Sequence, residues 1–296
     1  MAIIQSDITL PAPAPAPARV GGARRYVRRH PTIVVGSVLL LLMTAMAVFA
    51  PYLGTVDPQA LAPIRRLKWP SAAYWFGTDM LGRDVYSRTI YGARVSLIVG
   101  VSVALLSTAF GLAIGVVAGF TRWVDAIVMR IMDGLMSIPS VLIAIALMAL
   151  TRASLQNVIF AITVAEVPRV TRLVRGVVLT LREQPYVEAA IASGTGFTRI
   201  LWRHIVPNTL PPLLVQGTFI AAAAMITEAI LSFLGAGTPP NIPSWGNIMA
   251  EGRSLFQVAY YIVLFPGLML SLTVLAINLL GDGLRDALDP RLARRL

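Results

Sequence analysis

Cysteine is absent from this 296-residue chain, and lysine and histidine are rare. Without cysteine, neither a disulfide nor a thiolate metal site can form. The one lysine, Lys68, follows no glycine-rich loop, which excludes the phosphate-binding motif of P-loop nucleotide hydrolases. The two histidines, His30 and His204, cannot make a His-Glu-x-x-His zinc site, and no serine stands in a Gly-x-Ser-x-Gly motif. We therefore expect no cofactor or metal in this chain.

Charge is also scarce. Charged residues make up 13% of the chain and hydrophobic residues 56%, whereas about a quarter of a soluble protein is charged. Residues 95–121 and 254–281 form uncharged runs of 27 and 28 residues. Because about 20 apolar residues cross a bilayer, the chain is predicted to be an all-α membrane protein.

Six transmembrane helices are predicted from the apolar runs. They lie at about 32–50, within 95–121, and at about 130–150, 155–178, 208–234 and 257–281. Pro139 would kink the third. The expected organisation is a Pro- and Ala-rich tail (1–30), the first helix with a long polar extracytoplasmic loop (31–93), a core of five helices (94–286) and a C-terminal tail (287–296).

The distribution of basic residues predicts the orientation. An even number of spans places both termini on one side of the membrane. If that side is cytoplasmic, it receives 17 of the 25 basic residues, as the positive-inside rule requires. The net charge of +11 then reflects topology and not a nucleic-acid partner. A signal peptide cleaved near Ala45-Met46-Ala47 is the alternative for the first span, but the apolar run continues past that point, which favours an uncut helix.

The segment between the fourth and fifth spans carries the most informative pattern. Helix-forming residues around Glu188 precede a break at Gly194, and a second amphipathic turn is expected to end before Pro207. This predicts two short helices joined by a glycine corner. The second carries an apolar ridge beside two arginines, as protein-docking surfaces do: Phe197, Ile200, Leu201 and Trp202. A helix lying on lipid headgroups is the alternative.

Other polar residues invite structural as well as functional interpretations. Glu228 lies in an apolar span, where a carboxylate either bonds a neighbouring helix or lines a pore. Asp133 is expected to pair with Arg130, three residues earlier. Residues 78–84 read as a turn before an interfacial helix, with Arg83 and Asp84 as a local polar pair. A run of small residues favours close helix contact: Gly111, Gly115 and Gly119.

In this segment the chain resembles the transmembrane permeases of ATP-binding-cassette (ABC) importers. Their Glu-Ala-Ala…Gly…Pro loop is matched by Glu188, Ala189, Ala190, Gly194 and Pro207. The residues before that proline depart mildly from the family's ending, reading His-Ile-Val. The resemblance implies a cytoplasmic coupling loop that docks on an ATPase subunit, with Phe197 and Leu201 entering its groove.

Further segments are similar to the C-type permease subunit of dipeptide, oligopeptide and nickel importers. They include residues 76–84, 231–235 and 243–246. The resemblance implies a type I importer permease in the bacterial inner membrane that forms half of a pore for peptides or related small solutes. Expected partners are a second homologous permease, two ATPase subunits that bind ATP and Mg, and an extracytoplasmic binding protein. The substrate stays open among dipeptides, longer peptides, glutathione and metal chelates.

Two rival functions predict other features. A secondary transporter should carry ion-coupling carboxylates at mid-membrane and no docking loop. An intramembrane enzyme should cluster catalytic side chains at one depth, and the sequence contains no such cluster. The expected role is therefore a non-catalytic subunit.

Overall fold

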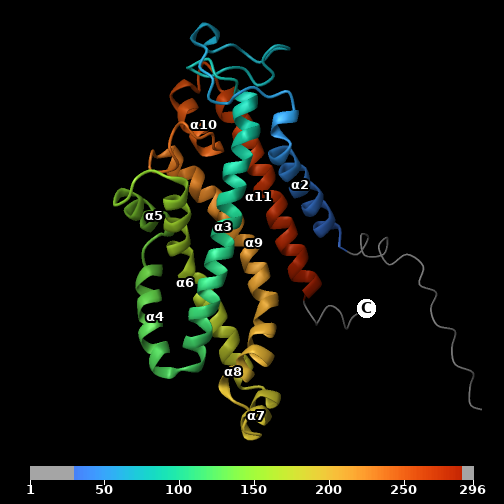
Figure 1. Ribbon diagram of the computed structural model, residues 1–296, viewed down its shortest axis with the longest axis vertical. Coiled ribbons are helices and arrows are strands. Elements are labelled where there is room, and N and C mark those ends of the chain that lie inside the picture. The colour runs from blue at the N-terminus through green and yellow to red at the C-terminus, as the bar shows by residue number, and fades with distance from the viewer. Residues whose placement is uncertain (1–29, 289–296) are drawn as a thin grey trace, which may run out of the picture.

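The computed structural model describes residues 30–288, and within them the chain is helical with a single isolated β-bridge. The predicted N-terminal tail and nearly all of the C-terminal tail lie outside this range. Figure 1 shows an elongated bundle of long helices with short helices at both ends. The helices are α2 (Pro31–Val48), η1 (Ala50–Tyr52), η2 (Pro63–Arg65), α3 (Val85–Phe120), α4 (Arg122–Met136), α5 (Ser140–Ala149), α6 (Leu155–Arg182), α7 (Pro185–Ala192), α8 (Phe197–Ile200), η3 (Leu201–Ile205), α9 (Val206–Phe233), α10 (Trp245–Gly252), η4 (Arg253–Leu255) and α11 (Tyr261–Leu288).

Four helical segments of the described chain are long and apolar enough to cross a membrane. They are α2, α3, α11 and the continuous segment from Phe197 to Phe233. A fifth crossing is counted if α4 and α5 together make one. The fourth predicted span corresponds to α6, which has 28 residues but carries Glu166 and four arginines. Length and apolarity therefore support four or five spans and leave the count of six unconfirmed.

The third predicted span is broken. Helices α4 and α5 meet at 88°, and Pro139 precedes α5 with extended backbone angles (φ −53°, ψ 131°). Proline lacks a backbone N–H and disfavours helical geometry in the residue before it. The expectation of one kinked helix over 130–150 was wrong, because the chain stops and restarts at this proline.

Helix α3 begins ten residues before the predicted span. The Asp84 carboxylate accepts a hydrogen bond from the Ser87 backbone N–H at 2.8 Å and caps the helix. The predicted polar loop therefore ends at residue 84, and the interfacial helix expected after the turn is the first part of α3. With 36 residues, α3 is about 54 Å long, well beyond the roughly 30 Å of a hydrocarbon core.

Glycines bring α3 and α6 into close contact, as the sequence predicts. A methyl group on Gly115 would lie 2.8 Å from Val174 Cβ, and one on Gly119 would lie 2.6 Å from Val178 Cγ1. Gly111 meets the same face of α6 one turn away. Since no larger residue fits, this stripe sets the separation of the two helices at the centre of the bundle.

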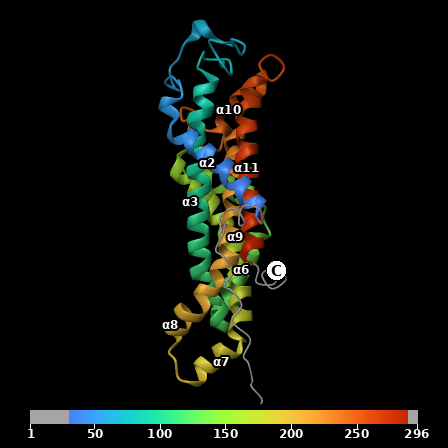
Figure 2. The same cartoon turned by 90° about the vertical axis from the view of Figure 1, so that its right-hand side faces the viewer.

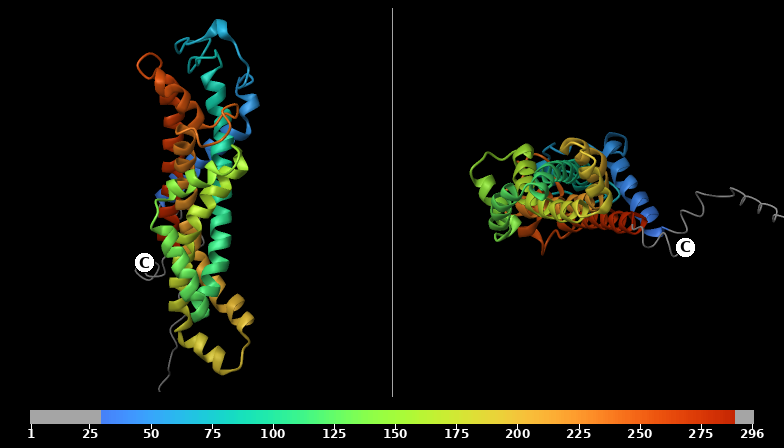
Figure 3. Two further views of the ribbon diagram at one scale, coloured as in Figure 1. Left: turned by 90° about the vertical axis from the view of Figure 1, so that its left-hand side faces the viewer. Right: turned by 90° about the horizontal axis from the view of Figure 1, so that it is seen from below.

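Both ends of the described chain lie together. Gly36 of α2 packs on Ala276 of α11, and Gly283 near the end of α11 packs on Ile33. Figures 2 and 3 show the loop of residues 51–84 at one end of the molecule and α7 with α8 projecting at the other, with the adjoining ends of α2 and α11 between them. This arrangement agrees with an even number of membrane crossings.

Candidate functional site

Residues 185–205, here called the docking loop, form the tip of the molecule. Helix α6 ends at Arg182, α7 runs away from the bundle, and α8 returns the chain to α9. The two short helices and the corner between them were predicted from the sequence. Their geometry places a compact, two-armed surface outside the main bundle (Figure 2).

The corner is a Schellman turn built on Gly194. Its φ is +76°, its N–H donates to the Ile191 carbonyl at 2.9 Å, and the Thr195 N–H donates to the Ala190 carbonyl at 3.0 Å. A side chain on Gly194 would meet no atom within 4 Å. The requirement for glycine is therefore one of backbone conformation and not of space.

The motif residues differ in exposure. Glu188 and Ala189 are exposed, Ala190 is half-buried, and the Glu188 side chain has no hydrogen bond or ion pair to any described residue. A free carboxylate on α7 is thus available to an external group. Sequence reasoning missed two exposed apolar side chains on this arm, Tyr186 and Ile191, which become recognisable once the helix is known to project.

The predicted apolar ridge is only partly a surface. Phe197 and Trp202 are exposed, at 52% and 66% of their area. Ile200 is buried, and Leu201 packs against the main hydrophobic core. Phe197 also meets the ring of Phe120 edge-on at 5.0 Å. Of the four predicted ridge residues, only Phe197 and Trp202 thus present large exposed side chains, whereas Leu201 is partly buried against the core.

The second arm does not end before Pro207. Residues 201–205 form a π turn, in which the Val206 N–H donates to the Leu201 carbonyl, and the helix continues into α9. Pro207, which has no backbone N–H, is the second residue of α9 and follows directly on this irregular turn, where the ordinary i→i−4 pattern is interrupted. The docking loop is consequently joined to α9 without a break.

Two ion pairs tie α4 to α6 near the docking loop. Asp133 pairs with Arg172, so the expected partner, Arg130, was wrong. Arg175 donates to both carboxylate oxygens of Asp125, at 2.5 and 2.7 Å. Arg172 and Arg175 of α6 thus hold a neighbouring helix at two positions. The acidic partners come from a different helix, 39 and 50 positions away in the sequence, so the sequence alone did not identify them.

Glu228 is fully buried at the end of α9. Its Oε1 accepts a hydrogen bond from Ser232 Oγ at 2.8 Å, and Oε2 has no partner within the described chain. Gly246 of α10 packs directly on Ala229 and Ser232 beside it. This hydrogen bond runs within α9, so the structure places Glu228 inside the subunit, and a bond to a neighbouring helix stays a prediction.

A buried ionic cluster organises the opposite end of the bundle. The Asp79 carboxylate accepts hydrogen bonds from Arg83 Nε at 2.7 Å and Arg88 at 2.6 Å. Both arginines also donate to Glu251 of α10, each at 2.5 Å. The local pair of Arg83 with Asp84 was therefore a wrong prediction, because Asp84 caps α3. Glu251 was missed, since it lies 163 positions from Arg88.

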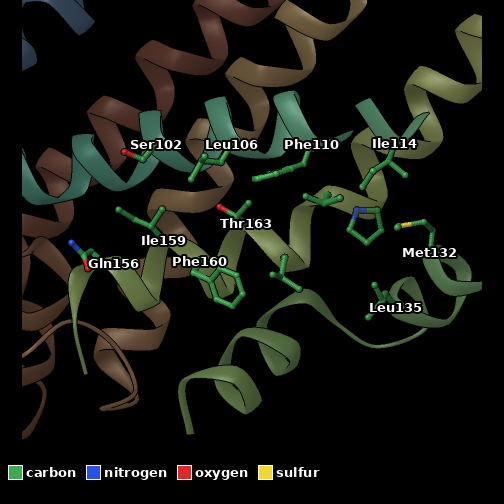
Figure 4. Close-up of a pocket in the computed structure, with 13 residues that line it drawn as sticks. Ser102, Leu106, Phe110, Ile114, Met132, Leu135, Gln156, Ile159, Phe160 and Thr163 are labelled. Carbon is green, nitrogen blue, oxygen red and sulfur yellow. The ribbon is translucent and has the colours of Figure 1, made fainter. Parts of the chain in front are cut away.

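An apolar cavity of about 640 Å³ lies between α3, α4 and α6. Figure 4 shows side chains from the three helices around it, with Phe110 on α3 and Phe160 on α6 among them. Thr163 lines it with a buried hydroxyl that lacks a hydrogen-bond partner in the described chain. Helix α4 forms one wall of this cavity, and the two ion pairs hold that helix to α6.

Comparisons with known proteins agree with this architecture. Residues 111–294 match the family described as binding-protein-dependent transport system inner membrane component. Residues 20–70 match the N-terminal TM domain of oligopeptide transport permease C. The fold is also similar to a chain of the methionine ABC transporter MetNI in an inward-facing conformation, with a TM-score of 0.56 and 23% identity, covering 68% of this chain and 96% of that one.

Relatives are similar over nearly their whole length. A probable peptide ABC transporter permease protein of Sinorhizobium fredii is 54% identical over 92% of this chain and 93% of its own. A glutathione transport system permease protein of Pectobacterium atrosepticum is 42% identical, with coverages of 91% and 90%. A dipeptide transport system permease protein of Alkalihalophilus pseudofirmus is 41% identical, with coverages of 91% and 89%. The chain belongs to the binding-protein-dependent transport system inner membrane component family, as a permease subunit of a peptide-type ABC importer.

Proposed function

We propose that this chain forms half of the pore of an ATP-driven importer for peptides or related small solutes, and that the docking loop couples it to an ATPase subunit. The observation that carries the proposal is the Gly194 corner, which holds two short helices outside the bundle. Exposed aromatic side chains on that projection, Phe197 and Trp202, are typical anchors of a protein interface. The printed names of the relatives supply the substrate class.

The partners follow from the same proposal. A second homologous permease would complete the pore, two ATPase subunits would bind ATP and Mg, and an extracytoplasmic binding protein would deliver the solute. This chain would act as the non-catalytic membrane subunit. Both termini and the docking loop would lie in the cytoplasm, and residues 51–84 outside the inner membrane, in keeping with the distribution of basic residues.

The helices offer a route for the coupling. The docking loop joins α6 at one end and α9 at the other, so a shift of the loop acts on two long helices together. Helix α6 is ion-paired with α4, which forms a wall of the apolar cavity. Closure of the ATPase dimer would thereby reach the cavity through contacts present in this chain.

The test replaces the two exposed aromatic anchors. Phe197→Asp with Trp202→Asp should leave the permease inserted and paired with its homologue, because neither side chain is buried. Desolvating two carboxylates in the interface should reduce retention of the ATPase at least about tenfold. Pull-down and ATPase activity in proteoliposomes with added binding protein measure both effects. Leu201→Asp is less suitable, since Leu201 also packs in the core.

Thr198→Asp is the matched control, because it adds a carboxylate to an exposed position of α8 without removing an anchor. It should retain most ATPase binding. Wild-type stimulation in the double variant would mean that the loop is a membrane-surface helix and would reject the coupling proposal.

A further inference from the structure

A second groove, of about 490 Å³, lies between α6, α9 and α11 in the half of the bundle nearer the docking loop. Leu173 of α6, Val215 and Phe219 of α9 and Leu288 of α11 form apolar parts of its wall. Among the residues that the structure describes, Arg285 of α11 is the only charged one in its lining. The groove thus combines a long apolar surface with a cation at one end.

The groove occupies a face of α11 that α2 leaves free. Gly281, Arg285 and Leu288 follow one another at helical spacing and share that face. Gly281 packs toward α9, where the Phe219 ring would lie 3.7 Å from an added methyl group. The contact of α11 with α2 uses another stripe, which includes Gly283. The first helix of this chain therefore does not cover the groove.

Arg285 lies where a lipid headgroup would be found. The uncharged run of α11 ends at Gly281, so the Arg285 backbone is about 6 Å further along the helix. An arginine stem extends along apolar surface and places the guanidinium at the membrane boundary. Under the orientation proposed above, on which this inference rests, that boundary is the cytoplasmic one.

The Arg285 guanidinium is also free. It is exposed and has no hydrogen bond or ion pair with any described residue, although Asp282 and Asp286 are near in sequence. Further cations follow it in the sequence: Arg291, Arg294 and Arg295. A free guanidinium binds phosphate through two parallel hydrogen bonds, and basic pockets between helices on the cytoplasmic side favour anionic headgroups.

We propose that this groove binds one anionic phospholipid, with an acyl chain along Val215 and Phe219 and the phosphate on Arg285. The neighbouring side chain of Leu214 is 58% exposed, which is the surface expected where α9 faces hydrocarbon. Leu288, beside Arg285, closes the groove near the headgroup. The bilayer itself supplies the ligand.

The test uses the assembled transporter in nanodiscs of phosphatidylcholine, with or without phosphatidylglycerol. Native mass spectrometry counts retained phosphatidylglycerol, and thermal unfolding measures its stabilising effect. The wild type should retain phosphatidylglycerol and unfold at a higher temperature with it. Arg285→Gln should weaken retention about tenfold, as expected for one lost charge-assisted contact. Val215→Trp should do the same by filling the groove while keeping the charge.

Arg130→Gln is the control, because it removes an equal charge from an exposed arginine of α4 that has no partner in the described chain. It should retain phosphatidylglycerol like the wild type. Unchanged retention in Arg285→Gln and Val215→Trp, or equal retention of phosphatidylcholine, would overturn the proposal. Loss of the second permease from Val215→Trp would also overturn it, by making the groove a subunit interface. Since no readout involves ATPase coupling, failure here would leave the docking-loop proposal intact.

Discussion

No acidic side chain in the described chain is more buried than that of Glu228. It has one serine hydrogen bond and no ion pair, so its environment is that of a polar group sealed between packed helices. An unpaired carboxylate is costly at such a site. Gly246 of α10 packs on Ala229 and Ser232 beside it, so the carboxylate lies next to the contact between α9 and α10.

We expect Glu228→Gln to be mild, because the amide oxygen can still accept a hydrogen bond from Ser232. Glu228→Leu should lower stability by roughly 1 kcal/mol, as for the loss of one hydrogen bond, here the one from Ser232 four residues along α9. Complex yield and uptake are the measurements, and Ser232→Ala is the control that removes the same bond from its other side. Wild-type yield and uptake in the leucine variant would show the carboxylate to be incidental.

Single residues were predictable where their partners are local. Gly194 satisfies a turn within its own segment, which followed from residue type and spacing. The turn before α3 was predicted in the same way, although Asp84 caps that helix and does not pair with Arg83. The partner of Arg88 was not predicted, because Glu251 reaches it only through the packing of α10 on α3. Ion pairs between helices depend on the fold that forms them.

At the scale of elements, apolar runs predicted α2 and α11 to within several residues because both are lipid-length segments. They underestimated α3, whose first ten residues include Arg88 and Arg94. Arginines are compatible with a helix but not with a hydrocarbon environment. The hydrophobic pattern therefore identified the membrane-spanning part of α3 and missed where the helix begins. Proline gave the opposite error at Pro139, where a predicted kink is a break.

Two ion pairs attach α4 to α6, and their contributions to stability can be compared. The Asp125–Arg175 pair is bidentate and partly shielded, with side chains 22% and 32% exposed, whereas Asp133 and Arg172 are 58% and 48% exposed. A double-mutant cycle with Asp125→Asn and Arg175→Gln should give a coupling energy of about 1 kcal/mol. The same cycle at Asp133 and Arg172 should give less and vanish in high salt. Equal coupling at both pairs would contradict this order.

The molecule as a whole presents different surfaces at its two ends. The end bearing residues 51–84 is fastened by the buried cluster of Asp79, Arg83, Arg88 and Glu251. The other end carries the projecting docking loop, and the two ends of the described chain lie side by side between these extremes (Figure 1). A firmly held end opposite a projecting one suits the proposal that this subunit transmits movement across a membrane.

Reporter fusions test this orientation. A reporter placed after Arg65 should be active outside the membrane, whereas reporters after Gly194 or Arg291 should be active inside, because the inner segments hold 17 of the 25 basic residues. Alkaline phosphatase and green fluorescent protein fusions report the two sides. An outside signal at Gly194 would remove the docking loop from the reach of any ATPase.

The length of α3 has a consequence for the continuity of the chain. Because α3 is longer than the hydrocarbon core is thick, we expect the loop before α3 to lie outside the membrane. Ile64 in that loop is 96% exposed. Severing the backbone there would leave the first helix attached by Arg94 to the Ala47 carbonyl, at 2.5 Å, and by the Val56 N–H to Ser87 Oγ, at 2.9 Å. Two separately translated polypeptides, meeting in the membrane, could therefore rebuild this subunit without a covalent link between them.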